Sequence, residues 1–144
     1  MPHDLSPKPT LAGAKALLAS ARLPTGDLDE GHCDSFFYSG TAERPTGLVG
    51  LELFGAVGLV RSLVVEEGRR GSGEGAALLA HAEAQARARG VRELYLLTNT
   101  AESFFARHGY VRTPRDSAPP AIRATPEFAG LCPSSAAFMI HRLC

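Results

Sequence analysis

The chain has 144 residues, in which 15 Lys and Arg balance 15 Asp and Glu, so the formal net charge is zero. This length suits one domain with one core, and we expect residues 1–144 to form a single domain. The balanced charge excludes a general field that would attract nucleic acid or an anionic membrane, so any anion site must be local.

The first half of the chain predicts one helix and three strands. Thr10 can cap the helix and Pro24 follows its end. A loop with Thr, Gly and Asp comes next, in which a partial second helix is the alternative, before three aromatic residues that favour a strand. The expected ranges are 10–23 for the helix, 24–31 for the loop, 32–38 for the first strand, and 48–54 and 57–65 for a hairpin that turns at residues 54–56.

The second half opens with the clearest helix of the chain, residues 73–89, which is rich in Ala and Leu. Glu74 in its first turn suits the helix dipole, and Gly90 stops the helix. Strands and helices then alternate, so part of the sheet is expected to be parallel, and the fold class is α+β with a mixed sheet. The remaining ranges are 94–98 and 110–113 for strands, 101–108 for a helix, a short helix with Thr125 as cap and Pro126 at its first position, and a last strand over 135–143.

No apolar run has the length of a membrane span, and residues 1–9 lack the continuous apolar stretch of a secretory signal. The cysteines Cys33, Cys132 and Cys144 are far apart and form no Cys-x-x-Cys pair, so each is expected to be a free thiol. We therefore expect a cytoplasmic protein without nucleic-acid or membrane partners. His32, Cys33 and Cys132 are too isolated to predict a metal or arsenic site, and no metal is expected.

The most informative segment runs from Leu63 to Gly75, where an apolar strand enters a glycine-rich turn that opens a helix. Glycine lets a phosphate approach the backbone, while unpaired amides at the helix start, the helix dipole and nearby arginines favour an anion. The segment therefore predicts a diphosphate cradle. A Rossmann turn would need an acidic ribose partner on a following parallel strand. The phosphate loop of a nucleotide triphosphatase would need Gly-Lys-Ser or Gly-Lys-Thr, which is absent. A purely structural turn is the remaining alternative.

Arg70, Gly73 and Gly75 match the acetyl-CoA signature of the GNAT acetyltransferases, and the chain resembles that superfamily in a second motif as well. The second motif is met at Thr98, Ala101, Phe105, Gly109 and Tyr110. Thr98 replaces the usual Asn, and Phe105 stands where many members have the tyrosine that protonates the leaving thiolate. A phenyl ring donates no proton, but a thiol leaves readily as thiolate, so loss of this acid need not abolish transfer.

Two subfamilies share these departures. The segment around residues 97–105 is similar to the acetyltransferase domain of bacterial N-acetylglutamate synthases. Together with residues 121–128 and the Leu-Cys-Pro-Ser-Ser-Ala run at 131–136, it more closely resembles the GNAT subfamily named for arsenic-resistance operons. That resemblance covers nearly the whole chain.

The resemblance implies the GNAT acyl-CoA N-acyltransferase fold, a splayed, mostly antiparallel sheet flanked by helices, with acetyl-CoA between the strands that end at Val65 and Thr98. It implies that backbone amides near Val65 hold the pantetheine arm and the thioester oxygen. The expected cofactor contacts are Leu63, Val64, Val65, Arg69, Arg70, Gly71, Ser72, Gly73, Glu74, Gly75, Thr98 and Phe105.

Three charged residues are candidates for work on the acceptor. Glu52 lies inside an apolar strand, where a charge needs a partner or a solvated cleft, so it is the candidate general base or an outward-facing residue. Arg61, placed on one strand face with Leu63 and Val65, is a candidate to grip a substrate carboxylate, and an ion pair with Glu52 is the alternative. Arg123, in a proline-bounded loop, is a second candidate, with plain surface exposure as its alternative.

We therefore expect an N-acetyltransferase that moves acetyl from acetyl-CoA to a small-molecule amine, with no metal. The resemblance favours an amino acid or an acidic amino-acid analogue, including one that contains arsenic. The alternatives are an acetylase of protein or peptide amines, a GNAT-like domain that binds acetyl-CoA without transfer, and a small interaction module. The oligomeric state is left open, a homodimer included.

Overall fold

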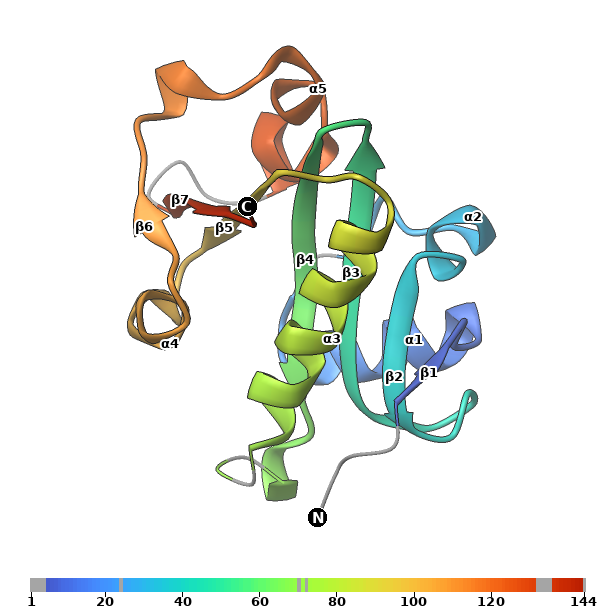
Figure 1. Cartoon of the computed structure of the whole chain (residues 1–144). Coiled ribbons are helices and arrows are strands. Elements are labelled where there is room, and N and C mark those ends of the chain that lie inside the picture. Colours follow the sequence, from blue (N-terminus) through green and yellow to red (C-terminus); the bar gives the residue numbers. More distant parts are fainter. Residues whose placement is uncertain (1–4, 24, 70, 72, 132–135, 144) are drawn as a thin grey trace.

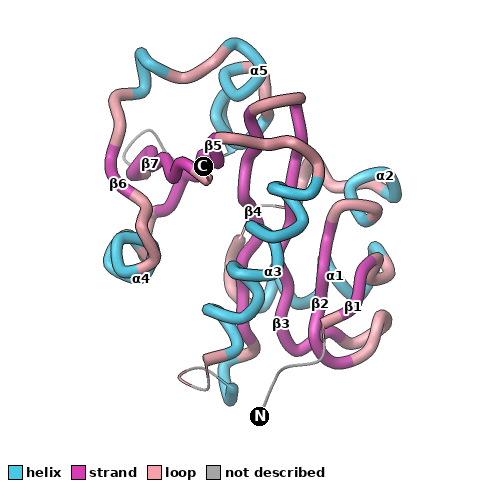
Figure 2. Tube along the Cα trace, in the orientation of Figure 1, coloured by secondary structure: helices cyan, strands magenta, loops and turns pink. Residues whose placement is uncertain are grey.

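The computed structural model of the chain describes residues 5–23, 25–69, 71, 73–131 and 136–143. Its centre is a seven-stranded sheet with the strand order β1-β2-β3-β4-β5-β7-β6 (Figures 1 and 2). Every neighbouring pair is antiparallel except β4 and β5. The strands are β1 (Ser6–Pro7), β2 (Phe36–Gly40), β3 (Pro45–Phe54), β4 (Val57–Val65), β5 (Glu93–Thr98), β6 (Val111–Arg112) and β7 (Ala137–Arg142).

Helices cover both faces of the sheet (Figure 1). They are α1 (Leu11–Ser20), α2 (Glu30–Cys33), α3 (Glu74–Ala88), α4 (Glu102–Arg107) and α5 (Pro120–Arg123), with short helical turns η1 (Glu67–Arg69), η2 (Arg115–Ser117) and η3 (Glu127–Leu131). None of the helices in the described part of the chain has both the length and the apolar character needed to cross a membrane.

Strand alternation divides the core between the two faces of the sheet. Val49 and Leu51 of β3 point to one face and pack against α3. Leu48 points to the other face and packs against α1 and the start of β2. A third apolar cluster, centred on Ile122 of α5, lies over β5 and β7. The face opposite α3 is therefore covered by two separate groups of helices, with β4 between them.

The parallel strands β4 and β5 part soon after they meet. They pair only from Val57 with Glu93 to Leu59 with Tyr95. Beyond Leu59, β4 stays paired with β3, while β5 stays paired with β7 up to Thr98. Since neither strand pairs with the other over residues 60–65 and 96–98, the sheet splays at its centre, as the sequence predicted.

A β-bulge in β4 corrects one prediction. Leu48 pairs with Val64 and Gly50 pairs with Arg61, so the segment 61–64 of β4 lies opposite the segment 48–50 of β3 and contains one extra residue. The extra residue is accommodated at Ser62, whose φ is 59°. Leu63 and Val65 consequently pack with the α3 face, whereas Arg61 points to the opposite face. The predicted placement of Arg61 on the same face as Leu63 and Val65 is therefore wrong, because simple alternation fails across a bulge.

Most predicted elements form within a few residues of the expected bounds, and the differences have local causes. The strand expected from His32 begins at Phe36, because Asp29 caps a turn of helix over Glu30–Cys33. Thr125 accepts a hydrogen bond from the Phe128 amide and caps η3, as expected. The preceding α5 was not predicted. Pro120 stands at its start, where a proline lacks only an N–H that would be unpaired anyway.

Candidate active site

The start of α3 has the form of an anion cradle. Gly71 and Gly73 have φ values of 83° and 84°, in the left-handed region that favours glycine. Apart from each glycine's own chain neighbours, no atom of the described residues lies within 4 Å of where a side chain on either would begin. Gly73 is the N-cap of α3 and provides no capping side chain. Backbone amides at this helix start can therefore meet a phosphate without a side chain in the way.

Glu74 takes part in the cradle differently from the prediction, because its side chain points inward. The carboxylate is fully buried and accepts hydrogen bonds from Ser39 at 2.7 Å and from Arg69 Nε at 3.0 Å. Burial alone would raise the pKa of Glu74, but these hydrogen bonds and the Arg69 charge hold the pKa below its ordinary value. Only the backbone of Glu74 faces the cradle, and the Arg69 charge is largely balanced by Glu74. Arg70 and Ser72 lie outside the described residues.

The gap between β4 and β5 lies next to this cradle. Leu63 and Val65 pack against the α3 core, so the backbone of this part of β4 borders the gap on the side where β5 has parted from it. Phe104 lies at the same place, since a side chain on Gly75 would meet the Phe104 ring and Val65 at 3.7 Å. The first turn of α3, the end of β4 and an aromatic ring of α4 are thus neighbours.

The second motif supplies packing and a cap. Thr98 Oγ1 accepts a hydrogen bond from the Ala101 amide at 3.0 Å at the start of α4. Phe105 is buried, and its ring packs edge-on against Phe104 and Tyr110. Phe104, which is only partly buried, borders the gap more directly than Phe105 does. Phe104 was not among the predicted cofactor contacts, because motif spacing marks the position of Phe105.

On the face opposite α3, Arg61 is surrounded by three carboxylates. Its Nη1 donates to Glu52 Oε2 at 2.8 Å, and its Nη1 and Nη2 form a two-point contact with Asp27. Its Nη2 also lies 3.1 Å from Glu127 Oε1. Asp27 comes from the loop before α2, Glu52 from β3 and Glu127 from η3, so Arg61 joins the two groups of helices across β4. We call Asp27, Glu52, Arg61 and Glu127 the Arg61 cluster.

The Arg61 cluster is almost closed to solvent, with side-chain exposures of 0% for Arg61 and 13% for Glu52. Burial alone would lower the pKa of Arg61, but its bonds to Asp27 and Glu52 and the charge of Glu127 raise it above its ordinary value. Burial likewise would raise the pKa of Asp27, yet the Arg61 contacts lower it. Among the described residues, Asp27 and Glu52 share the one guanidinium of Arg61, so their side of the cluster favours a further cation rather than an anion.

His32 faces the Arg61 cluster from α2. Its Nε2 lies 3.9 Å from Asp27 Oδ2 and 4.0 Å from Glu52 Oε2. The three ligand atoms of Asp27, His32 and Glu52 lie within 4.8 Å of one another, a spacing that could hold a metal ion. The guanidinium of Arg61 already bonds both carboxylates, so it competes for this place.

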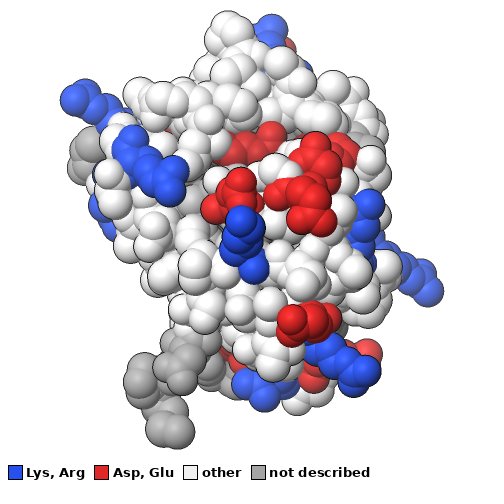
Figure 3. Space-filling model, turned by 90° about the vertical axis from the view of Figure 1, so that its right-hand side faces the viewer, with Lys and Arg blue, Asp and Glu red and all other residues white. Residues whose placement is uncertain are grey.

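A shallow pocket of about 400 Å³ opens beside this group. His32 and Glu52 line it together with Asp29, Phe54 and Arg89. The pocket runs along the part of β3 that lies beyond its pairing with Phe36, where β2 begins. Acidic side chains gather on the side of the molecule that carries α2 and β2 (Figure 3).

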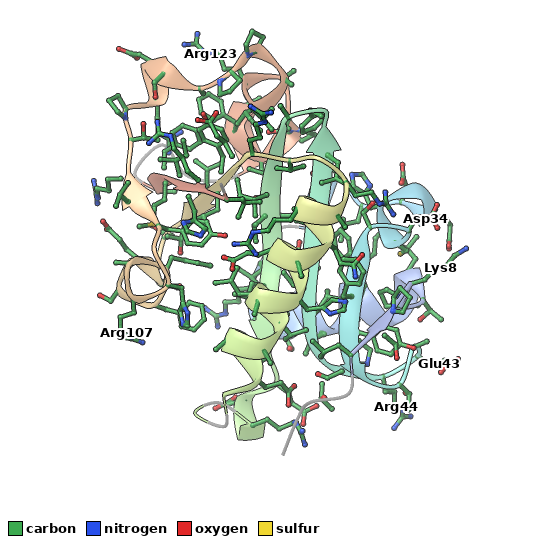
Figure 4. The ribbon with its side chains drawn as sticks, viewed as in Figure 1. Lys8, Asp34, Glu43, Arg44, Arg107 and Arg123 are labelled. Carbon is green, nitrogen blue, oxygen red and sulfur yellow. The ribbon has the colours of Figure 1, made fainter. Side chains whose placement is uncertain are left out.

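The structure brings Glu52 and Arg61 together and leaves Arg123 apart. The ion pair between Glu52 and Arg61, the alternative interpretation of both residues, is present. Arg123 points away from the sheet at the outer surface (Figure 4) and donates to the carbonyls of Ala118 and Asp116. Sequence reasoning missed Asp27, Glu127 and the contact of His32, because residues from three distant segments meet only in the folded chain.

Comparison with known proteins gives a consistent picture. Residues 33–112 match the family model described as an acetyltransferase (GNAT) domain. An amino-acid acetyltransferase from Ralstonia nicotianae is 40% identical over 63 residues, which is 44% of this chain but only 14% of that protein. The chain thus spans a small part of its curated relative.

Solved structures share the fold at low identity. N-acetylglutamate synthase from Neisseria gonorrhoeae, solved with coenzyme A and L-arginine, superposes with a TM-score of 0.80 and 21% identity, over 96% of this chain and 32% of that chain. A protein from Mycobacterium tuberculosis solved with CoA superposes with a TM-score of 0.79 and 18% identity, over 98% of this chain and 99% of that chain. The predicted fold class is confirmed.

Proposed function

The chain belongs to the GNAT acetyltransferase family, and we propose that it transfers an acetyl group from acetyl-CoA to the amine of a small molecule. The observation that carries this proposal is the junction of two features: the open glycine turn at the start of α3 and the gap where β4 leaves β5. A phosphate-bearing head and a long, thin thioester arm suit such a junction. We propose that residues 1–144 act as one acetyltransferase domain in the cytoplasm, with the oligomeric state left open.

The cofactor contacts follow from this junction. We assign the diphosphate to the backbone around Gly71, Gly73 and Glu74, with Arg69 and Gly75 beside it. Arg70 and Ser72 remain contacts proposed from the sequence alone. The pantetheine arm would follow Leu63 to Val65 and pass Thr98 and the aromatic pair of α4. A backbone amide of β4 would stabilise the negative charge that develops on the thioester oxygen.

The acceptor amine would approach from the face opposite α3, where the Arg61 cluster lies. The carboxylates of Asp27 and Glu52 favour the ammonium form of an amine. Glu52, or a water that it orients, removes the proton, and the neutral amine attacks the thioester carbon. The thiolate needs no dedicated acid, which is consistent with a buried phenylalanine at position 105.

For the acceptor we propose an amino acid or an acidic amino-acid analogue, including one that contains arsenic. The support is the likeness to an amino-acid acetyltransferase and to N-acetylglutamate synthase, and the resemblance to the arsenic-resistance subfamily. Arg61 remains the candidate ligand for an acidic group, although it would have to exchange one of its three carboxylate partners. Arg123 has a weaker case, since its donors already bind backbone carbonyls.

A thiol-release assay with acetyl-CoA tests the proposal against a panel of acceptors. The panel contains neutral and acidic amino acids, their arsenic and phosphorus analogues, polyamines, aminoglycosides and a short peptide. We expect turnover with at least one amino acid or acidic analogue. Preference for the peptide would support a protein acetylase, and tight acetyl-CoA binding without thiol release would support a non-catalytic binding domain.

A further inference from the structure

We propose that His32 receives from Glu52 the proton that leaves the acceptor amine and releases it to solvent. This inference rests on the proposed acetyl transfer and assigns a residue that the sequence did not select. Glu52 is largely buried and bonded to Arg61, so a proton that Glu52 takes up must be transferred to solvent before the next turnover.

The position of the imidazole answers that problem. His32 Nε2 lies 4.0 Å from Glu52 Oε2 and makes no hydrogen bond to any residue that the structure describes. One bridging water or a small rotation of either side chain closes this span. The side chain of His32 is 22% exposed, against 13% for Glu52, and it lines the pocket of about 400 Å³. His32 is therefore the more exposed of the two neighbouring groups that line this pocket.

The ring is held in place from its other side. His32 Nδ1 lies 3.0 Å from Asp29 Oδ1 at the start of α2, and in the tautomer in which Nδ1 donates to this carboxylate, Nε2 is free to accept a proton. This contact fixes the direction of the ring, so that Nε2 faces the cluster. Asp29, Asp27 and Glu52 all face the imidazole, while Arg61 is bonded to two of them and Arg89 lines the same pocket.

An imidazole is in general also a better proton acceptor than a carboxylate. Imidazole accepts and releases protons near neutral pH, whereas a carboxylate is in general a much weaker base. The ammonium N–H bond breaks as Glu52 Oε2 takes the proton and passes it to His32 Nε2. The freed electron pair of the amine attacks the thioester carbon, and the C–S electrons leave on the CoA thiolate, which takes the second proton from the new amide nitrogen. The imidazolium then gives its proton to water.

The test is His32→Gln, because glutamine can keep a polar contact to Asp29 but cannot carry the proton. With the best acceptor of the panel, we expect kcat to fall about tenfold or more while KM for acetyl-CoA is unchanged. Imidazole added to the buffer should restore kcat in proportion to its concentration. The matched control is His141→Gln on β7, whose ring bonds the Gly109 carbonyl far from the cluster and which should keep the parent kcat.

Four outcomes overturn the proposal. An unchanged kcat in His32→Gln removes the role, and a loss that imidazole does not restore indicates a structural role for His32. Loss of parent activity on treatment with a chelator, restored by a divalent metal, would assign His32 to a metal site instead. If the parent releases no thiol with any amine, acetyl transfer itself fails and this inference fails with it.

Discussion

Arg61 was predicted to bind a substrate carboxylate or to pair with Glu52, and the structure shows it in a buried ion cluster. Its guanidinium, with a side-chain exposure of 0%, contacts Asp27, Glu52 and Glu127. A buried ion group of this kind is costly to assemble, but removing one partner from it is more costly still, since the other charges stay buried and uncompensated. Arg61 therefore has a structural role that does not depend on substrate binding.

We expect Arg61→Ala to lower the free energy of unfolding by about 3–5 kcal/mol at pH 7, measured by denaturant titration. The parent's advantage should shrink as the pH falls. The pKa of Asp27 is lowered in the folded parent, so its stabilising contribution is present above its unfolded pKa and is lost as the pH falls through the folded pKa. In the variant, protonation instead relieves the repulsion among the carboxylates.

The control is Arg123→Ala, which removes an exposed arginine bonded only to backbone carbonyls and should change stability by less than about 1 kcal/mol. If Arg61→Ala unfolds like the parent and instead raises KM for an acidic acceptor, the cluster is not the main role of Arg61. Its binding of a substrate carboxylate would then be the better account.

Residue-level prediction from the sequence worked where spacing along the chain determines neighbours. The Glu52–Arg61 pair could be predicted because the two residues belong to adjacent strands of one hairpin. Asp27 and Glu127 could not, because they reach Arg61 from a loop and a turn about 100 residues apart in sequence. No local sequence pattern predicts which loops of the two helix groups contact each other over β4.

At the scale of elements, the cradle depends on the backbone of the turn before α3. Strand, glycine turn and helix were predictable in order because each has its own composition signal. The bulge at Ser62 was not, since a non-glycine residue with a φ of 59° leaves no mark in the sequence. The bulge decides which face Arg61 takes, so it places the Arg61 cluster on the face opposite α3.

We expect Gly73→Val to weaken acetyl-CoA binding at least tenfold, measured by calorimetry, while the domain stays folded. A branched side chain is strained at a φ of 84° and would cover amides that are now open. Gly90→Val is the matched control. Gly90 follows the other end of α3 with a φ of 86° and open space around it, so the variant carries similar strain without touching the cradle.

Comparison of the two glycine variants separates strain from ligand contact. Both should lose a similar amount of stability in a thermal melt, and only Gly73→Val should lose affinity. Equal affinities for acetyl-CoA would show that the diphosphate binds elsewhere.

At the scale of the whole molecule, the splayed sheet connects the two regions. The cradle and α3 lie on one face of the sheet, the Arg61 cluster lies on the other, and β4 parts from β5 between them (Figure 1). The mixed sheet was predictable from the order of elements. The extent of the gap was not, because it depends on how far β5 follows β7 instead of β4.

The central claim is that an amine bound beside Glu52 attacks acetyl-CoA held at the cradle. The most direct test is the initial rate of thiol release by the parent and by Glu52→Gln, with mass analysis of the acceptor from the same reaction. We predict one acetylated acceptor per thiol released by the parent, and a kcat about a hundredfold lower in Glu52→Gln with KM for acetyl-CoA unchanged. A parent that binds acetyl-CoA but releases no thiol with any amine, or a Glu52→Gln variant as fast as the parent, would contradict this account.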